Sequence, residues 1–214
     1  MYSKFEEKSE KKATDVFGRV KNCISFTKNN VFRLGGGAGN TCGITFGRDN
    51  DNNNCSSCMK IRIAEEKDID RVHGLLTQVG ALHHAGRPDL FRAGERKYTD
   101  EELRQIFVDA KTPVLVAVDD DDSVVGYAFC MFVQHKDSHI LTDICTLYVD
   151  DICVDENMRG RHIGTLLYDA VVELARERRC HNVTLNVWCC NEPAMSFYEK
   201  CGMKPLKVGM EMIL

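Results

Sequence analysis

Apolar residues recur at helical spacing in the part of the chain that follows residue 58. From Asp68 onward they return every three or four residues, which is the period of one helix face. The members of this face are Ile69, Val72, Leu75, Leu76, Val79 and Leu82. A second helix is expected after Thr99-Asp-Glu-Glu102, because this segment has capping-box spacing. Further helices are expected over 163–179 and 192–200.

Short runs rich in β-branched residues predict the strands. Val124 to Gln134 follows the acidic turn Asp119 to Ser123 and is expected to form a hairpin with Pro113 to Val118. The other expected strands are 59–63, a run ending in Asp150-Asp-Ile-Cys-Val154, 183–188 and the C-terminal end of the chain. The order βααβββαβαβ predicts a mixed α/β domain over residues 59–214.

Residues 1–58 lack this periodicity and are interpreted as an N-terminal extension, flexible or weakly structured. The segment Val16 to Phe26 is compatible with one short helix. The glycine-rich run Leu34 to Asn40 is interpreted as coil, because it lacks the Gly-Lys-Ser/Thr of a phosphate loop. Residues 1–60 carry 10 Lys and Arg against 6 Asp and Glu, whereas 61–214 carry 18 against 26. The charge balance therefore changes sign near Met59, from +4 to −8.

Composition excludes several classes of protein. A hydrophobic fraction of 43% supports a buried core. No apolar run approaches the roughly 20 residues of a membrane span, so no membrane partner is expected. A net charge of −4 is too small to favour nucleic acid as a partner. The charged segment Met1 to Lys12 is unlike a signal peptide, so a cytoplasmic location is expected.

Eleven cysteines, an odd count without a secretory signal, indicate reduced thiols. Cys23, Cys42, Cys55 and Cys58 together could form a four-thiolate zinc site, but their spacing matches no usual zinc motif. Incidental cysteines are the favoured interpretation, and no metal is expected.

The clearest chemical signal is the segment Asp151 to Thr165, in which a strand leads through a short loop into a long helix. A helix N-terminus presents unpaired N–H groups and partial positive charge, and Arg159 and Arg161 add cationic side chains. Gly160 and Gly164 allow the backbone to approach a ligand closely. These features predict a pyrophosphate site, with a basic solvated helix start as the alternative.

A second signal is Asn191-Glu-Pro-Ala-Met-Ser-Phe-Tyr-Glu-Lys-Cys-Gly202. Asn191 is a plausible N-cap and Pro193 suits the first helical turn. Tyr198 lies about two turns further along, on nearly the same face. A buried structural tyrosine is the alternative interpretation of this residue.

Together these segments resemble the GNAT superfamily of acyl-CoA-dependent N-acetyltransferases over roughly residues 60–214. The family motif Arg/Gln-x-x-Gly-x-Gly/Ala is matched by Arg159-Gly-Arg-His-Ile-Gly164, except that His162 replaces the middle glycine. The family's C-terminal Asn…Tyr pair is matched by Asn191 and Tyr198.

The resemblance implies a single domain with a central, mostly antiparallel twisted sheet, flanked by helices and splayed where acetyl-CoA binds. The implied contacts of the pantetheine arm are Ile152, Cys153, Val154 and Asn191. The implied pyrophosphate contacts are Arg159, Gly160, Arg161, His162, Ile163, Gly164 and Thr165. Tyr198 would protonate the departing thiolate, since a phenol of pKa about 10 is protonated at neutral pH.

The substitution at His162 is expected to leave this loop able to bind a phosphate. A histidine tolerates right-handed helical geometry, so its N–H can still donate. It is expected to lose the freedom to reach positive φ that a glycine has. The imidazole could contact a phosphate instead.

The attacking amine must lose a proton, and Asp150 or Asp151 is the expected base. Adjacent strand residues point to opposite faces, so only one of the two is expected to face the cleft. A strand-edge carboxylate facing solvent is the alternative for each. Asn186 stands where the related ribosomal-protein acetyltransferases carry a glutamate base, which weakens the case for a peptide N-terminus as acceptor.

The acceptor is expected to be a small-molecule amine that contacts His84, Arg87 and Asp89, unless this stretch is only a helix-terminating loop. The domain charge of −8 suits a cationic acceptor. A protein or peptide acceptor, and a non-catalytic acyl-CoA-binding domain, are the alternatives. Cys153 and the pair Cys189-Cys190 are interpreted as small hydrophobic residues rather than nucleophiles. Homodimers are common among the proteins that the chain resembles, but the sequence identifies no interface.

Overall fold

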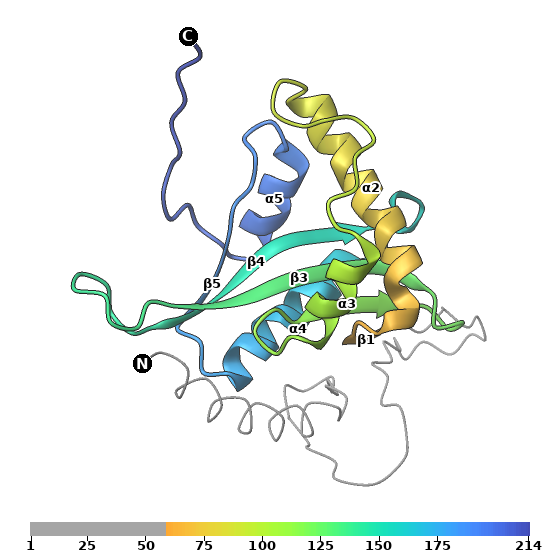
Figure 1. Ribbon diagram of the computed structural model, residues 1–214, viewed down its shortest axis with the longest axis horizontal. Helices are drawn as coiled ribbons and strands as arrows, with labels where there is room; N and C mark the ends of the chain where they lie inside the picture. The colour runs from red at the N-terminus through yellow and green to blue at the C-terminus, as the bar shows by residue number, and fades with distance from the viewer. Residues whose placement is uncertain (1–58) are drawn as a thin grey trace, which may run out of the picture.

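A single five-stranded sheet lies at the centre of the computed structural model, which describes residues 59–214 (Figure 1). The strands lie in chain order, and the first four pair antiparallel. Their bounds are β1 Lys60–Ile63, β2 Val114–Val118, β3 Val124–Gln134, β4 Cys145–Val154 and β5 Asn182–Leu185. Only β5 is parallel to its neighbour, β4. The expected sheet, mostly antiparallel, is confirmed.

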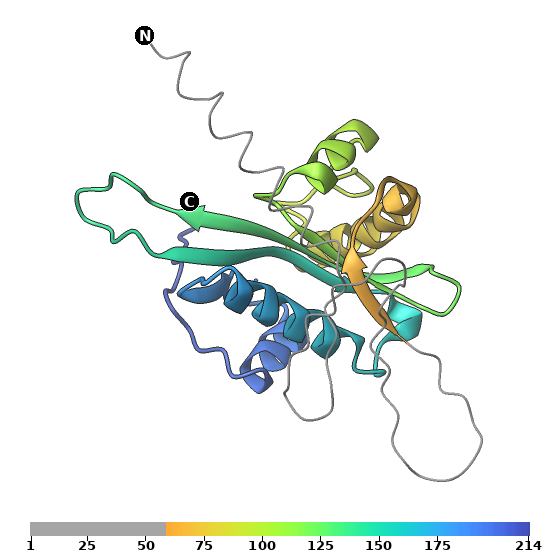
Figure 2. The same ribbon diagram turned by 90° about the horizontal axis from the view of Figure 1, so that it is seen from below.

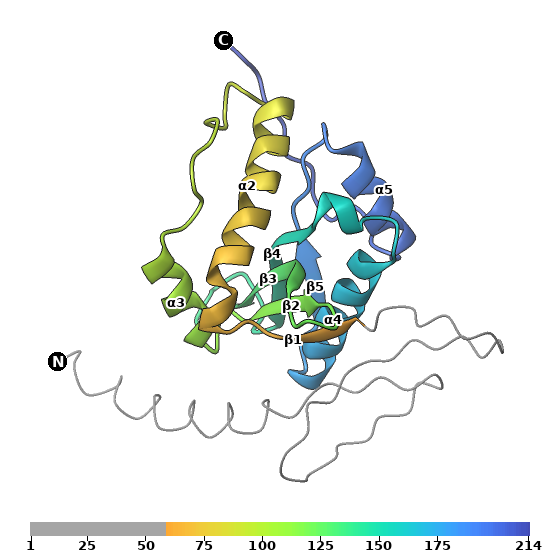
Figure 3. The same cartoon turned by 90° about the vertical axis from the view of Figure 1, so that its right-hand side faces the viewer.

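Helices cover both faces of the sheet. They are α2 Ile69–Gly86, α3 Asp100–Val108, α4 Ile163–Glu177 and α5 Glu192–Lys200, with short 3₁₀ turns at Glu66–Asp68 and Glu156–Met158. Figures 2 and 3 show α2 and α3 on one face and α4 and α5 on the other. All five residues of β2 are buried, as a strand between two covered faces requires. The sheet therefore separates two apolar cores.

Local sequence signals place most helix ends correctly. The capping box is present, since the Thr99 hydroxyl accepts from the Glu102 N–H and the Glu102 carboxylate accepts from the Thr99 N–H. Asp68 does not cap α2 with its side chain. Its carboxylate instead binds the Arg62 guanidinium, with contacts of 2.6 and 2.8 Å. Helix α4 ends at Glu177, two residues earlier than expected.

The C-terminal strand expectation is wrong in this structure. Residues 203–214 form no strand. Strand β5 is also shorter than expected, because it ends at Leu185 rather than at Trp188.

The sheet parts between β4 and β5. Their pairing covers only Thr146–Val149 and Asn182–Leu185, while β4 continues to Val154 and leads into α4. The last four residues of β4 therefore pair with β3 alone. This is the splay that the sequence resemblance implied, and it opens beside the N-terminus of α4.

Several expectations concern residues outside 59–214. The short helix over 16–26, the glycine-rich coil and the alternative four-cysteine zinc site all lie in residues 1–58, which the structure does not describe. Within the described residues, every helix is too short or too polar to cross a membrane.

Candidate active site

A β-bulge in β4 shapes the centre of the candidate site. Phe129 pairs with Asp151 and Cys130 pairs with Val149, so Asp150 has no partner on β3. A bulge re-aims the side chains around it. Both carboxylates consequently reach the Lys97 ammonium, at 2.9 Å from Asp150 and 3.7 Å from Asp151. The expectation that they point to opposite faces is wrong, because it assumed regular pleating.

The Asp151 carboxylate is the most enclosed charged group of this cluster, with 11% of its side chain exposed. The Tyr127 hydroxyl donates to it at 3.0 Å. Burial raises the pKa of Asp151, and the nearby Lys97, Tyr127 and His83 counteract part of that rise. A carboxylate whose pKa is raised in this way is a stronger base than an exposed aspartate.

Lys97 belongs to the loop between α2 and α3, for which the sequence predicts only a polar character. Its neighbour Tyr98 donates to Asp150 at 3.4 Å and stacks on Phe129 of β3 at 5.7 Å. These contacts hold the loop against the bulge. No local pattern marks Lys97 or Tyr127, because their roles depend on contacts with β4.

Tyr198 lies on α5, across the parted strands from Asp151. Burial raises the pKa of its phenol, and the negative charge of Asp151 raises it further. The phenol is therefore protonated at neutral pH. Asn191 caps α5, since its side-chain oxygen accepts from the Ala194 N–H at 3.2 Å. The N-cap expected from the sequence is confirmed.

The segment before α4 leaves its backbone donors unpaired. Among residues 59–214, none of the N–H groups from Arg159 to Thr165 donates a hydrogen bond to the protein. Asp155 fixes the start of this loop, because its buried carboxylate accepts from the Asn157 N–H at 3.0 Å and from Arg71 at 2.8 Å. Unpaired donors at a helix N-terminus form an anion site.

His162, the N-cap of α4, has a φ of 62° and a ψ of 14°. This is the left-handed region, so the expectation of right-handed helical geometry is wrong. Glycine adopts this conformation without steric cost, whereas the Cβ of a histidine makes it unfavourable. The backbone at His162 therefore carries strain.

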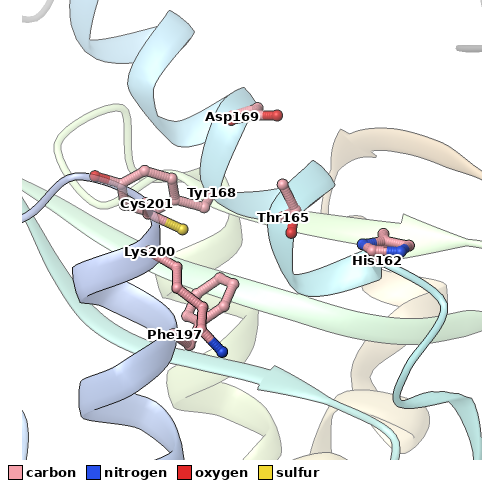
Figure 4. Close-up of a pocket in the computed structure, with 7 residues that line it drawn as sticks. All are labelled: His162, Thr165, Tyr168, Asp169, Phe197, Lys200 and Cys201. Atoms are coloured by element: carbon pink, nitrogen blue, oxygen red, sulfur yellow. The ribbon is translucent and has the colours of Figure 1, made fainter.

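A cavity of about 490 Å³ lies between the first turns of α4 and the end of α5 (Figure 4). His162 and Thr165 line the α4 side, and Phe197 and Lys200 line the α5 side. The unpaired N–H groups and this cavity thus meet at one end of α4.

The three residues expected to bind the acceptor all make contacts within the protein. His84 Nδ1 contacts the Phe91 carbonyl at 2.7 Å. The Arg87 guanidinium binds Asp89 at 2.7 Å and Glu211 at 2.9 Å. These contacts shape the α2–α3 loop, and a direct role in acceptor binding stays a prediction.

Two aromatic side chains that no sequence motif marks lie in this region. Phe91 contacts the ring of His83 at 4.9 Å and that of Trp188 at 5.3 Å between centroids. Trp188 comes from the segment after β5, so the contact links the two sides of the parted sheet.

Cysteine chemistry is not supported at Cys153. Its thiol is buried and contacts the Leu75 carbonyl at 3.7 Å. Burial raises the pKa of the thiol to about 12, so it is not a nucleophile at neutral pH. In residues 59–214, no group of three or more His, Cys, Asp or Glu side chains is placed to bind a metal ion.

Comparisons with known proteins found a matching family and related sequences. Residues 81–203 match the model of the acetyltransferase (GNAT) family. A glucosamine 6-phosphate N-acetyltransferase of Oryza sativa is 38% identical over 152 residues, covering 71% of this chain and 84% of that protein. A putative [ribosomal protein bS18]-alanine N-acetyltransferase of Bacillus subtilis is 33% identical over 86 residues. That match spans 56% of the relative, and a Candida albicans glucosamine 6-phosphate N-acetyltransferase is matched over 51% of its length.

Solved structures share the fold. A mutant of the BH1408 protein from Bacillus halodurans superposes with a TM-score of 0.69 at 32% identity, covering 72% of this chain and 98% of that one. The glucosamine-6-phosphate N-acetyltransferase of Arabidopsis thaliana has a TM-score of 0.51 at 20% identity, covering 72% and 97%.

Proposed function

The chain belongs to the acetyltransferase (GNAT) family, and from this premise we propose that it transfers an acetyl group from acetyl-CoA to the primary amine of a small molecule. The observation that carries the proposal is the parting of β4 and β5 directly before the unpaired N–H groups of α4. An open strand edge followed by an anion site suits an extended ligand with a pyrophosphate.

The described residues fit acetyl-CoA at three places. The backbone of Ile152 to Val154 would hold the pantetheine arm, and the N–H groups of Arg159 to Thr165 would hold the pyrophosphate. The cavity beside Lys200 would take the nucleotide end. When bound, acetyl-CoA supplies the acetyl group as an activated thioester.

We assign the base to Asp151 and the acid to Tyr198. Asp151 is buried and hydrogen-bonded, and its raised pKa suits proton removal from an ammonium. Tyr198 stays protonated and can deliver a proton to the leaving thiolate. Asp150 is more exposed, at 33%, and is assigned a supporting role through Lys97.

The acceptor is proposed to carry an anionic group beside its amine. The segment 83–97 holds four Lys and Arg against two acidic residues, although the whole domain is acidic. Arg92 of this segment is exposed and makes no ion pair within residues 59–214. Local charge governs a bound ligand more strongly than net charge. A phosphorylated amino sugar, the acceptor named in several relatives, has this chemistry.

Thiol release from acetyl-CoA across an amine panel tests this proposal. The panel contains glucosamine 6-phosphate, glucosamine, spermidine and a peptide with a free N-terminal alanine. Fastest turnover with the phosphorylated sugar is expected. Preference for the peptide would support the protein-acetyltransferase alternative, and CoA binding without any release would support a non-catalytic domain.

Asp151→Asn is expected to reduce kcat by roughly 10²–10⁴-fold, which is the usual contribution of a general base. Affinity for CoA should change little, because the pyrophosphate contacts lie beyond the strand. Asp150→Asn is the matched variant and should lose much less activity. Equal losses in both variants, measured by steady-state kinetics, would contradict the assignment of the base.

The cytoplasmic location also stays a proposal. Its support is the number of cysteines that are free thiols in residues 59–214, which suits a reducing compartment. Assembly as a homodimer is likewise proposed.

A further inference from the structure

Two cysteine thiols contact each other where the pairing between β4 and β5 begins. The Sγ atoms of Cys145 and Cys180 are 3.7 Å apart, although 35 positions separate the two residues along the chain. Cys145 is the first residue of β4, and Cys180 lies between α4 and β5. The proposed site uses neither thiol.

The backbone beside both thiols is held in place. The His181 N–H donates to the Cys145 carbonyl at 2.7 Å. The Cys180 N–H donates to the carbonyl of Ala175, near the end of α4, at 2.8 Å. The sulfur atoms therefore face each other from fixed positions of the chain. A disulfide bond is about 2.0 Å long, so rotation of the two side chains has only a short gap to close.

Both thiols are half-buried, whereas Cys130 and Cys153 are buried in the core. Burial raises the pKa of the Cys180 thiol, and the neighbouring Cys145 thiol raises it further. The thiolate is the form that attacks a disulfide, so exchange is slow at neutral pH and faster at alkaline pH. The pair is therefore within reach of a small oxidant, with which it reacts slowly.

The contact lies where a covalent bond would limit the parting of the strands. The pairing of β4 with β5 spans only four residues of each strand, from Thr146 and Asn182 onward. On its other side, β5 pairs with no strand of residues 59–214. Helix α5, which follows β5, has no buried residue. A bond at the start of this short pairing would hold β5 and α5 more firmly to the rest of the domain.

We propose that Cys145 and Cys180 form a reversible disulfide when the surrounding glutathione pool becomes oxidising, and that this bond ties β5 to β4. One thiolate attacks glutathione disulfide, which leaves a mixed disulfide on the protein and releases one reduced glutathione. The second thiolate attacks the protein sulfur of the mixed disulfide and releases another reduced glutathione. The protein loses two electrons and two protons, and glutathione disulfide gains them.

The disulfide should stabilise the folded chain, because it restricts the unfolded chain over the 35 positions between the two cysteines. Oxidation should raise the thermal midpoint by at least about 3 °C, and dithiothreitol should reverse the rise. Hydrogen exchange gives a local measurement. Amides of Val183 to Leu185 should exchange at least about threefold more slowly in the oxidised chain, because β5 opens less often.

Peptide mapping of the full chain tests the proposal directly. The chain is equilibrated at about pH 8.5 with mixtures of reduced and oxidised glutathione, from reducing to oxidising, and is then alkylated. Digestion with trypsin and chymotrypsin separates Cys180 from Cys189 and Cys190, because chymotrypsin cleaves after Trp188. The expected product joins the peptides of Cys145 and Cys180 and is about 2 Da lighter than the two free thiols together.

Cys145→Ser should abolish both the cross-link and the rise in the thermal midpoint on oxidation, and Cys180→Ser should do the same independently. Cys189→Ser is the matched control at an exposed cysteine and should retain both. Circular dichroism of the reduced variants checks that each one folds.

Absence of the cross-link from the folded chain at every glutathione ratio would overturn the proposal. So would a cross-link that forms only in urea, or one that joins either cysteine to a different thiol. An unchanged thermal midpoint and unchanged exchange of the β5 amides in the cross-linked chain would overturn the tie between the strands. None of these measurements depends on acetyl transfer, so their outcome is separate from that of the proposed function.

Discussion

Asp151 illustrates how one residue acquires reactivity from several elements. The groups that face it are Lys97 from the α2–α3 loop, Tyr127 from β3, His83 from α2, Asp150 from β4 and Tyr198 from α5. Burial raises the pKa of Asp151, while the ammonium of Lys97 lowers it. The balance between these two effects determines the pH at which the proposed base becomes active.

Lys97→Met is expected to move the acidic limb of the kcat/KM profile to higher pH by about one pH unit. The reason is that loss of the ammonium removes an interaction that lowers the pKa of Asp151, so deprotonation requires a higher pH. Lys97→Arg keeps the charge and should retain the profile of the unaltered protein. A profile that stays in place in Lys97→Met would show that this ammonium does not control the base.

His162→Gly is expected to increase the free energy of unfolding by about 0.5–1 kcal/mol, because glycine relieves a left-handed conformation that costs about 1–2 kcal/mol in other residues. Arg161→Gly is the matched control, since Arg161 has no positive φ. It should lower stability, because only the flexibility of the unfolded chain increases. Urea unfolding of both variants measures whether the free energy of unfolding rises in His162→Gly and falls in Arg161→Gly.

At the scale of elements, the loop from β4 to α4 depends on Asp155. The Asn157 N–H holds the pKa of this buried carboxyl below its usual range, with Arg71 contributing further. A lowered pKa means that Asp155 stabilises the folded chain fully at neutral pH. This contribution is lost as the pH falls below about 4, where the unfolded chain takes up the proton first.

Asp155→Ala should reduce the free energy of unfolding by about 2 kcal/mol at neutral pH, since it removes charged hydrogen bonds from a buried site. The exposed Asp143→Ala should change it by less than about 0.5 kcal/mol. Urea titrations at pH 7 and at about pH 3 measure both variants. The difference between them should shrink at the lower pH; a constant difference would exclude an ionised Asp155 as the cause.

At the scale of the whole molecule, the two faces of the sheet carry different parts of the candidate site. The α4 and α5 side provides the anion site and the cavity, while the α2 and α3 side provides Lys97 and the loop over the carboxylates. The parted strands join the two sides. Under the proposed function, acetyl-CoA and the acceptor would enter this opening from opposite sides.

The boundary near Met59 remains a proposal from the sequence. Limited trypsin digestion should cleave within residues 1–58 at least tenfold faster than within 59–214, because a folded core protects its backbone. Mass spectrometry of the early products should find fragments that begin near Met59 and still bind CoA. A chain that resists cleavage before Met59 would contradict the boundary.

Local sequence determined the types of most elements and most of their ends, the C-terminal strand being the exception. Strand β3 and helix α5 have the expected bounds, and Thr99 forms the expected capping box. These features depend on residues within a few positions of one another, where periodicity and capping act. The family motif at Arg159 to Gly164 is also local, so the order of its residues is enough to identify it.

Tertiary structure decided what distant segments do to one another. The bulge at Asp150 turned two carboxylates toward one lysine, and Lys97 reached them from 53 residues away. The left-handed φ of His162 likewise departs from the local preference of a histidine. A sequence shows which residues are able to form a strand or to act as a base. The contacts between strands and loops determine which residues take these roles.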